Sequence, residues 1–250
     1  MFYGPDQATI HHREFTGLAD AAASHLLGLL AARGLHGSVV DLGCGSGVLA
    51  RRLTDAGYDV TGFDLSESMV ALAREHAPRA RFTAAALLDA ELPSPCVAVA
   101  ATGEVLNYGT DPRTGLDAMA RLAVRVHEAV VPGGLWLFDV AGPGRGGPDR
   151  RVEVFHRHDD WCLGVVATES EDGRRLDPAI TIFTAAESGG YQRADEDHVL
   201  RLYSEAEVRA VLERAGFEVD VIAGYEAPGG RVQLSGWYVV QAWRSPVGIG

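Results

Sequence analysis

A glycine-rich turn between an apolar run and an amphipathic stretch constrains the fold more than any other feature of the chain. The segment VVDLGCGSGVLARRL carries glycines at Gly43, Gly45 and Gly47. Glycine tolerates positive φ and lets a ligand approach the backbone, and N–H groups at the start of the next helix point outward. We therefore expect a strand–turn–helix unit that binds a ligand at this turn.

The regions around this unit repeat the same alternation of apolar strand and helix. Strands that are apolar throughout, without strict alternation, specify a parallel sheet that helices cover on both faces. A Pro-Gly-Gly turn at 132–134 is expected to separate the last helix of the series from its last strand. The expected helices cover 16–33, 46–57, 66–77 and about 113–131, and the expected strands cover 38–43, 58–64, 79–85, 96–103 and 135–140.

The pattern changes after the flexible segment GPGRGGP. Residues 150–202 carry β-branched and aromatic residues between turns, which predicts an antiparallel β insertion of three or four strands. Ser204 and Glu207 then have the spacing of a capping box at the start of a helix. Two last strands, about 217–224 and 233–243, are expected to complete the sheet. We expect a single domain over 1–250, with an N-terminal cap and helix over 1–34.

Composition limits the classes of binding partner and the cellular compartments that we expect for this protein. The net charge of −12 argues against a nucleic-acid surface or an anionic membrane as partner. The three cysteines Cys44, Cys96 and Cys162 form no CxxC pair, which favours a reducing compartment and argues against a zinc site. The N-terminus lacks the pattern of a signal peptide, and no apolar run is long enough to span a bilayer. We expect a cytoplasmic, soluble protein.

Two acids beside the glycine-rich turn indicate the kind of ligand. Asp41 lies two residues before Gly43 and would repel an anion but attract an amino group. Asp64 follows Gly43 by 21 residues at the end of the next strand, where a carboxylate can accept both hydroxyl protons of a ribose. A dinucleotide fingerprint wants Gly or Ala where this chain has Val48, so an NAD(P)-dependent oxidoreductase is the less favoured alternative. Another alternative is that both acids only end strands and cap helices.

Five segments in order resemble the successive motifs of class I S-adenosylmethionine-dependent methyltransferases of the small-molecule type. They are VVDLGCGSG, VTGFDLSESMVALAR, RFTAAALLDAELP, GEVLNY and VVPGGLWLFDV, and the tail YSEAEVRAVLERAGFEV is similar too. The resemblance spans roughly 38–140. It implies an α/β fold with a Rossmann-like seven-stranded sheet of order 3-2-1-4-5-7-6, in which strand 7 is antiparallel. It also implies S-adenosyl-L-methionine as cofactor and a small-molecule acceptor.

The resemblance also implies positions for the cofactor contacts. One departure concerns adenine, because many family members place an acid after strand 3 where this chain has Ala86 and Leu87. Asp89 lies three residues further on, so we expect apolar contacts and backbone groups to hold adenine. The implied contacts are Gly43, Cys44, Gly45 and Gly47 for the methionine and ribose parts, Asp41 for the amino group, Asp64 for the ribose, and Leu65, Met69, Ala86 and Leu87 for adenine.

The candidate catalytic residues follow the fourth and fifth strands, where ligands bind in open α/β sheets. Glu104 is the first candidate, as a polar group near the cofactor's sulfonium or the acceptor; the alternative is an acid of an ordinary turn. Asn107, Tyr108 and Asp139 lie in the same region, and each suits a structural role as well.

Histidines are further candidates, because their side chains exchange protons near neutrality. His11 belongs to an N-terminal segment, with Tyr3 and His12, that folds over the cofactor in related enzymes. His156 and His158 would share one face of an inserted strand. No second cluster supplies further metal ligands there, so we predict no metal site.

These observations predict an enzyme that transfers a methyl group to an O or N nucleophile of a metabolite by in-line displacement. The main alternative is a protein that binds S-adenosylmethionine without methyl transfer, as a regulator or in another type of reaction. The insertion over 150–202 would either cover the acceptor pocket as a lid or make a homodimer contact.

Overall fold

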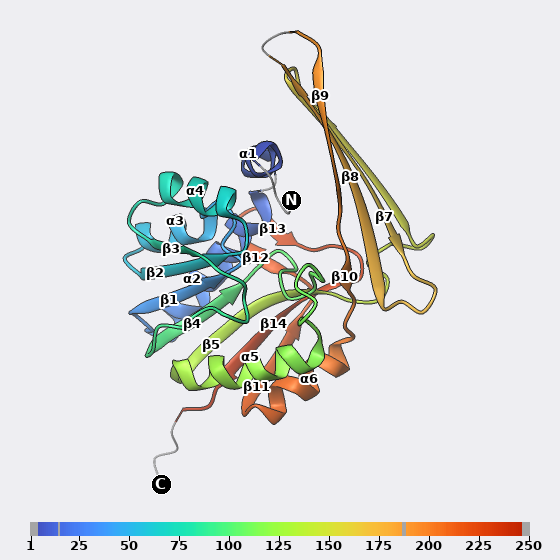
Figure 1. Cartoon of the computed structure of the whole chain (residues 1–250). Coiled ribbons are helices and arrows are strands. Elements are labelled where there is room, and N and C mark those ends of the chain that lie inside the picture. Colours follow the sequence, from blue (N-terminus) through green and yellow to red (C-terminus); the bar gives the residue numbers. More distant parts are fainter. Residues whose placement is uncertain (1–4, 15, 187–188, 247–250) are drawn as a thin grey trace.

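A seven-stranded mixed sheet forms the centre of the molecule (Figure 1). The computed structural model describes residues 5–14, 16–186 and 189–246. Six strands run in the same direction, and β14 runs antiparallel to both of its neighbours, β5 and β11, so the predicted order and the reversed seventh strand are confirmed. In spatial order the strands are β3 (Arg81–Ala84), β2 (Asp59–Asp64), β1 (Ser38–Leu42), β4 (Cys96–Ala101), β5 (Val130–Ala141), β14 (Trp237–Arg244) and β11 (Phe217–Ile222).

Helices cover both faces of this sheet because alternate residues of each buried strand face opposite layers. Val39 belongs to the apolar core on one face and Val40 to the core on the other. Within the described ranges, none of the helices has the length and hydropathy of a membrane span. The first layer holds α2 (Gly17–Ala32), α3 (Val48–Asp55) and α4 (Glu67–His76), and the second holds α5 (Leu116–Ala129) and α6 (Glu205–Arg214).

The capping residues read from the sequence define where two helices begin. Ser66 Oγ accepts a hydrogen bond from the Met69 N–H at 3.2 Å at the start of α4. Ser204 and Glu207 form the predicted capping box at the start of α6. Each bond satisfies a backbone donor that the helix itself leaves without a partner.

The predicted Pro-Gly-Gly turn is not a separate connection between helix and strand. β5 begins at Val130 directly after α5 and includes residues 132–134. Cys96 pairs with Val130, whereas Ala98, two residues later, pairs with Leu135. The intervening residues of β5 therefore form an irregularity in the ladder, which absorbs the backbone that the sequence assigns to a turn.

An antiparallel sheet, inserted between β5 and α6, extends beside the central sheet (Figure 1). It confirms the expected antiparallel insertion and adds a short final strand. The helix α1 (Pro5–Glu14) and a hairpin of β12 (Tyr225–Ala227) and β13 (Gly230–Val232) lie outside the predicted elements. The inserted strands are β6 (Arg151–Arg157), β7 (Trp161–Glu169), β8 (Arg175–Ala185), β9 (Tyr191–Asp197) and β10 (Leu200–Arg201).

The helix α1 packs against the inserted sheet. Ile10 shares an apolar cluster with Trp161 and Leu163, and Arg13 forms an ion pair with Asp160 at 3.1 Å. The N-terminal segment and the insertion, which are far apart in the sequence, therefore form one structure above the carboxyl ends of the central strands.

The buried side-chain amide of Asn107 helps to connect the insertion to the central sheet. Asn107 Nδ2 donates to the carbonyl oxygens of Ala141 at 2.8 Å and Arg201 at 2.6 Å, and its Oδ1 accepts from the Ala141 N–H at 3.0 Å. The Arg201 N–H also donates to the Asn107 carbonyl oxygen at 2.8 Å. This side chain thus fixes the segment after β4 to the end of β5 and to β10. Its role is structural, one of the two readings that the sequence left open.

We expect Asn107→Ala to lower the free energy of unfolding by about 3 kcal/mol, because buried backbone groups lose their partners. Urea unfolding followed by circular dichroism would measure the loss. Gln192→Ala is the control, because Gln192 is an exposed amide on β9. Equal unfolding midpoints for the two variants would contradict the structural role of Asn107.

Candidate functional site

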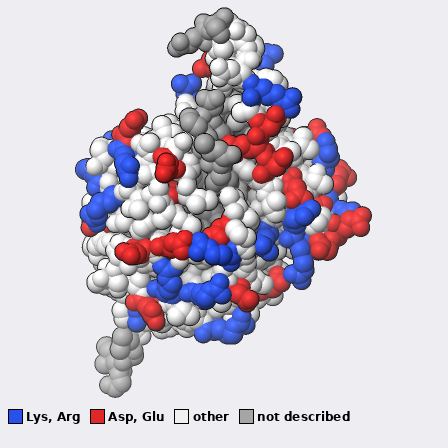
Figure 2. Space-filling view, in the orientation of Figure 1, with Lys and Arg blue, Asp and Glu red and all other residues white. Residues whose placement is uncertain are grey.

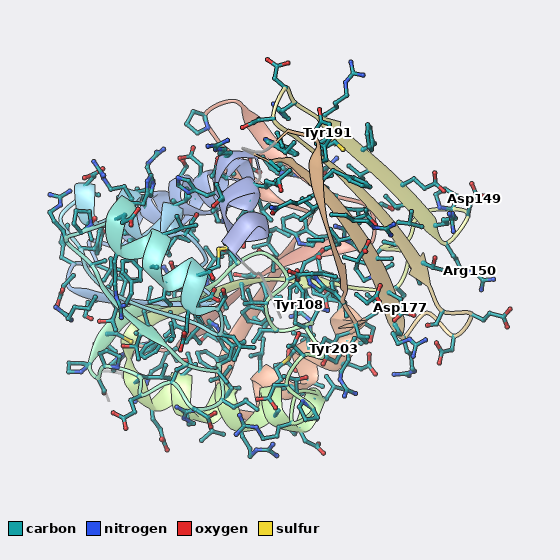
Figure 3. All side chains as sticks on the ribbon, turned by 45° about the horizontal axis from the view of Figure 1, so that its top comes forward. Tyr108, Asp149, Arg150, Asp177, Tyr191 and Tyr203 are labelled. Carbon is teal, nitrogen blue, oxygen red and sulfur yellow. The ribbon has the colours of Figure 1, made fainter. Side chains whose placement is uncertain are left out.

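Two adjoining cavities lie at the carboxyl ends of β1, β2 and β4, where open α/β sheets bind ligands. The smaller has a volume of about 140 Å³ and the larger about 690 Å³. They meet at the glycine-rich turn and at the segment after β4. Figure 3 places Tyr108 of that segment between the central and the inserted sheet. The residues that line both cavities are His11, Gly43, Gly45, Thr102, Gly103 and Tyr108.

The glycine-rich turn has the conformation that its sequence predicts. Gly43, Gly45 and Gly47 have φ of +71°, +50° and +79°. A Cβ on Gly43 would lie 2.4 Å from Cγ1 of Val105, in the segment after β4. Gly43 thus allows the turn to approach that segment closely, which brings the walls of both cavities together.

Asp64 lies at the end of β2 and lines the smaller cavity. Its Oδ2 accepts from the Gly45 N–H and its Oδ1 from the Ser66 N–H, both at 2.9 Å. These bonds fix the carboxylate, and each oxygen can accept a further hydrogen bond. Burial raises the pKa of Asp64, and the backbone hydrogen bonds oppose this shift. The arrangement fits two neighbouring hydroxyls of a ribose.

Asp41 is a buried carboxylate whose two oxygens have no hydrogen-bond partner within the described part of the chain. It lines the larger cavity beside the glycine-rich turn. Burial, with the nearby charge of Asp64, raises the pKa of Asp41 to about 7. An unpartnered buried carboxylate is costly, and an ammonium group would satisfy it. Asp41 therefore fits the amino group of S-adenosylmethionine.

The far end of the smaller cavity is apolar. Asp89 does not line it, and its Oδ2 pairs with Arg113 at 2.7 Å instead. Asp111 lines this cavity, although its carboxylate also pairs with Arg113, at 2.6 Å. No motif in the sequence pointed to Asp111, because it follows the fourth strand and not the third. The apolar lining is formed by Leu65, Met69, Ala86, Leu87 and Leu88, in keeping with the expectation for adenine.

Asp139 is structural. It is fully buried and accepts from the N–H groups of Gly103 at 2.8 Å and Glu104 at 2.5 Å. It also accepts from the Tyr225 hydroxyl at 2.7 Å and from Trp237 Nε1 at 3.3 Å. Burial raises the pKa of Asp139 to about 6, against the effect of these donors. Asp139 lines neither cavity and positions the backbone that does.

Glu104 lines the larger cavity, and not the smaller one. Its φ of +60° is uncommon for a residue other than glycine, and the hydrogen bond from its N–H to Asp139 holds it there. Its Oε1 accepts from Arg145 Nε at 2.5 Å. Arg145 comes from the segment that the sequence indicates only as a flexible connection. The pair places one positive and one negative group at the junction of the cavities.

His11 lies at the junction of the two cavities. Burial and the neighbouring His12 lower the pKa of His11 to about 4, so its imidazole is neutral at pH 7. The ring of His12 is instead bonded through Nδ1 to Ser46 Oγ at 2.8 Å. Tyr3, the third candidate of this segment, lies outside the described residues.

The remaining candidates from the sequence have other surroundings. Cys44 is buried and lines the larger cavity, and burial raises the pKa of its thiol well above the ordinary value, so it is no thiolate nucleophile. The His158 ring stacks on Trp161 with 4.3 Å between ring centroids. In the described ranges, no group of three or more His, Cys, Asp and Glu side chains is arranged to hold a metal ion.

Sequence reasoning also missed His198 of the larger cavity and its partner Glu196, which does not line the cavity. His198 lies between β9 and β10, lines this cavity, and its Nε2 is 3.1 Å from Glu196 Oε2. Its ring packs edge-on against Tyr108 with centroids 5.6 Å apart. Tyr108 and His198 become neighbours because Asn107 and the Tyr108–Leu200 bridge join the insertion to the segment after β4.

Comparisons with known proteins agree with this geometry. Residues 39–134 match the family model of a methyltransferase domain. A putative methyltransferase of Geobacillus sp. (strain WCH70) is 29% identical over 205 residues, which cover 76% of this chain and 78% of that protein. The dTDP-4-amino-2,3,4,6-tetradeoxy-D-glucose N,N-dimethyltransferase of Saccharopolyspora spinosa is 25% identical, over 78% of this chain and 76% of that enzyme.

The fold has relatives among solved structures as well. The crystal structure of an S-adenosylmethionine-dependent methyltransferase from Clostridium acetobutylicum superposes with a TM-score of 0.79 at 16% identity. The match covers 96% of this chain and 98% of that one. The central sheet and its additions therefore form a known methyltransferase architecture over nearly the whole chain. S-adenosylmethionine is the cofactor that these proteins and the two carboxylates of the site indicate together.

We expect Asp64→Ala to weaken S-adenosylmethionine binding by about 10-fold to 100-fold, the effect of removing hydrogen bonds to a charged group. Isothermal titration calorimetry would measure it. Asp59→Ala is the matched control, since Asp59 begins the same strand and its exposed carboxylate pairs with Arg81. Unchanged affinity in Asp64→Ala would contradict the assignment of the ribose contact.

We expect Asp41→Asn to stabilise the ligand-free protein while it weakens cofactor binding. The folded-state pKa of Asp41, about 7, lies above its ordinary value of 3.8, so the ionised form costs stability. That cost grows as pH rises from about 4 to about 7 and stays constant above it. Thermal unfolding should therefore show a higher Tm for the variant at pH 8 and a shrinking difference towards pH 4. A lower Tm at pH 8 would contradict this account.

Proposed function

We propose that this chain is a class I S-adenosylmethionine-dependent methyltransferase that methylates an oxygen or nitrogen nucleophile of a small molecule. The observation that carries the proposal is the larger cavity of about 690 Å³, which joins the cofactor cavity at Gly43, Gly103 and Tyr108. This volume is typical of small-molecule sites. The face of the molecule in Figure 2 carries both signs of charge without a continuous basic surface for a nucleic acid.

Residues of the smaller cavity suit the adenosine part of the cofactor, and Asp41, which lines the larger cavity, suits its amino group. Asp64 would accept from the ribose hydroxyls, Asp41 would pair with the amino group, and Leu65 and Met69 would pack on adenine. S-adenosylmethionine supplies a methyl group that the positive charge on its sulfur already activates. The protein has to align an acceptor with that group and exclude water.

Alignment is the role we propose for His11 and Glu104. The neutral imidazole of His11 can accept a proton or a hydrogen bond at the junction of the cavities. Glu104, held by Arg145 and by the backbone bond to Asp139, can orient a polar group of the acceptor. Neither role requires a nucleophile in the protein, in accordance with a direct in-line displacement.

The inserted sheet acts in this proposal as a lid, not as a dimer contact. Val152, Val154 and Val165 face the larger cavity from β6 and β7.

The cysteines described here form no disulfide, which supports a reducing compartment such as the cytoplasm.

The proposal is tested by incubation with methyl-labelled S-adenosylmethionine and a panel of amines and phenols. We expect label in at least one small-molecule product, identified by its added methyl mass. With that acceptor, His11→Ala and Glu104→Gln should lower turnover about tenfold or more, in the range of a removed proton acceptor or orienting group. Val124→Ala, an exposed change on α5, is the control.

Two outcomes would contradict the proposal. Tight binding of the cofactor without any labelled product over a broad panel would favour a binding protein that does not transfer methyl groups. Full turnover in both variants would exclude His11 and Glu104 from acceptor alignment, while it leaves methyl transfer itself in place.

A further inference from the structure

The larger cavity has one consistently apolar wall. Along β6, β7 and β8, every second residue faces the cavity, as the alternation of a strand dictates. The side chains that the inserted sheet contributes there carry no charge. They are Val152, Val154, Leu163, Val165, Ala167, Leu176, Pro178 and Ile180.

His198 is the polar side chain that the described part of the insertion contributes to this cavity, and with Tyr108 of the segment after β4 it forms the polar end of the cavity. His198 is buried and paired with Glu196, whose carboxylate oxygen lies 3.1 Å from Nε2. The Gly109 N–H donates to the Val199 carbonyl oxygen at 2.7 Å, which holds this corner against the segment after β4. Tyr108, in contact with His198, lines both cavities. The polar end is thus adjacent to the place where the methyl group is expected.

The charges around the cavity do not suit a phosphate. Arg145 is the one Arg or Lys side chain among the described residues that line it, and Glu104 already accepts its hydrogen bond at 2.5 Å. Glu104 adds a carboxylate to the lining, and Asp41, which we assign to the amino group of the cofactor, adds no positive charge. A phosphate or diphosphate is normally held by several unpaired cationic side chains or backbone N–H groups. This cavity would repel such a group.

We propose that the acceptor is a mainly apolar molecule without a phosphate group, whose nucleophilic N–H or O–H lies at the polar end beside Tyr108 and His198. The inference rests on the proposed function, because it assigns the larger cavity to the acceptor. The apolar body packs against the inserted sheet, and burial of apolar surface there stabilises the complex. The nucleophile alone makes hydrogen bonds.

Binding of the neutral probe N-phenyl-1-naphthylamine tests the apolar wall, because its fluorescence rises in apolar surroundings. The protein is first saturated with S-adenosylhomocysteine. We expect Val154→Asp to weaken probe binding at least about tenfold, because the new carboxylate would be desolvated by the probe. Val124→Asp is the matched control: both valines are partly exposed, at 38% and 47%, but only Val154 lines the cavity.

A comparison of 1-naphthol with 1-methylnaphthalene as competitors of the probe tests the polar end. 1-Naphthol should displace the probe at a concentration about threefold to tenfold lower than 1-methylnaphthalene, the effect of one hydrogen bond. His198→Ala should remove this advantage. Thymidine diphosphate serves as the phosphate-bearing competitor and should neither displace the probe nor raise the Tm.

The outcomes separate this inference from the proposed function. If the unsubstituted protein does not bind S-adenosylhomocysteine, the cofactor site and with it the proposed function are contradicted. Intact S-adenosylhomocysteine binding with equal probe affinity in both valine variants would overturn the apolar wall alone. Displacement of the probe by thymidine diphosphate, or an advantage of 1-naphthol that survives His198→Ala, would overturn the assignment of the acceptor class.

Discussion

The site depends on one buried carboxylate that lines no cavity. Asp139 lies on β5, two residues before its end, and accepts from two backbone N–H groups after β4, a tyrosine hydroxyl of the β12–β13 hairpin and an indole N–H of β14. A carboxylate inside a protein is stable only when such donors surround it. These bonds fix the left-handed conformation of Glu104 and the position of Gly103. Because Gly103 lines both cavities, Asp139 determines the shape of the junction between cofactor and acceptor.

Asp41, on β1 of the same sheet, is a buried carboxylate whose hydrogen-bonding contrasts with that of Asp139. Both acids are buried at the ends of strands, but Asp139 has a complete set of donors and Asp41 has none among the described residues. The same burial therefore gives two different roles. A satisfied carboxylate organises the backbone, whereas an unsatisfied one stores an unfavourable energy that a cationic ligand can release. This contrast supports the proposal that Asp41 binds the amino group of the cofactor.

The sequence predicts the glycine-rich turn and its flanking strand and helix well because their determinants are local. The glycines, Asp41 and Asp64 lie within one strand–turn–helix–strand segment, and the turn geometry follows from residue types that tolerate it. Arg145, Asp111 and His198 escape prediction because the cavities they line are assembled from segments that are distant in the sequence. His198 reaches Tyr108 only through the pairing of β10 with β8 and the bonds of Asn107, and no periodicity encodes that contact. The Pro-Gly-Gly segment keeps a local irregularity, because residues 131–134 have no partners on β4, but β5 pairs with β4 on both sides of it and so continues through it.

The wall of the larger cavity that the inserted strands form can therefore change without affecting the smaller cavity, but the segment after β4 cannot. Substitutions on the cavity face of β6, β7 and β8 alter the wall that an acceptor meets and leave the glycine-rich turn and Asp64 untouched. Substitutions between Gly103 and Gly109 cannot do this, because that segment packs on Gly43, lines both cavities and pairs with the end of the insertion. In the function we propose, acceptor specificity can thus diverge through the inserted strands, whereas the segment after β4 contacts both cavities and the insertion at once. This constraint explains why a buried apolar strand ends here in a glutamate, an asparagine and a tyrosine: Glu104 lines the larger cavity, Asn107 joins the sheets, and Tyr108 lies where the cavities meet.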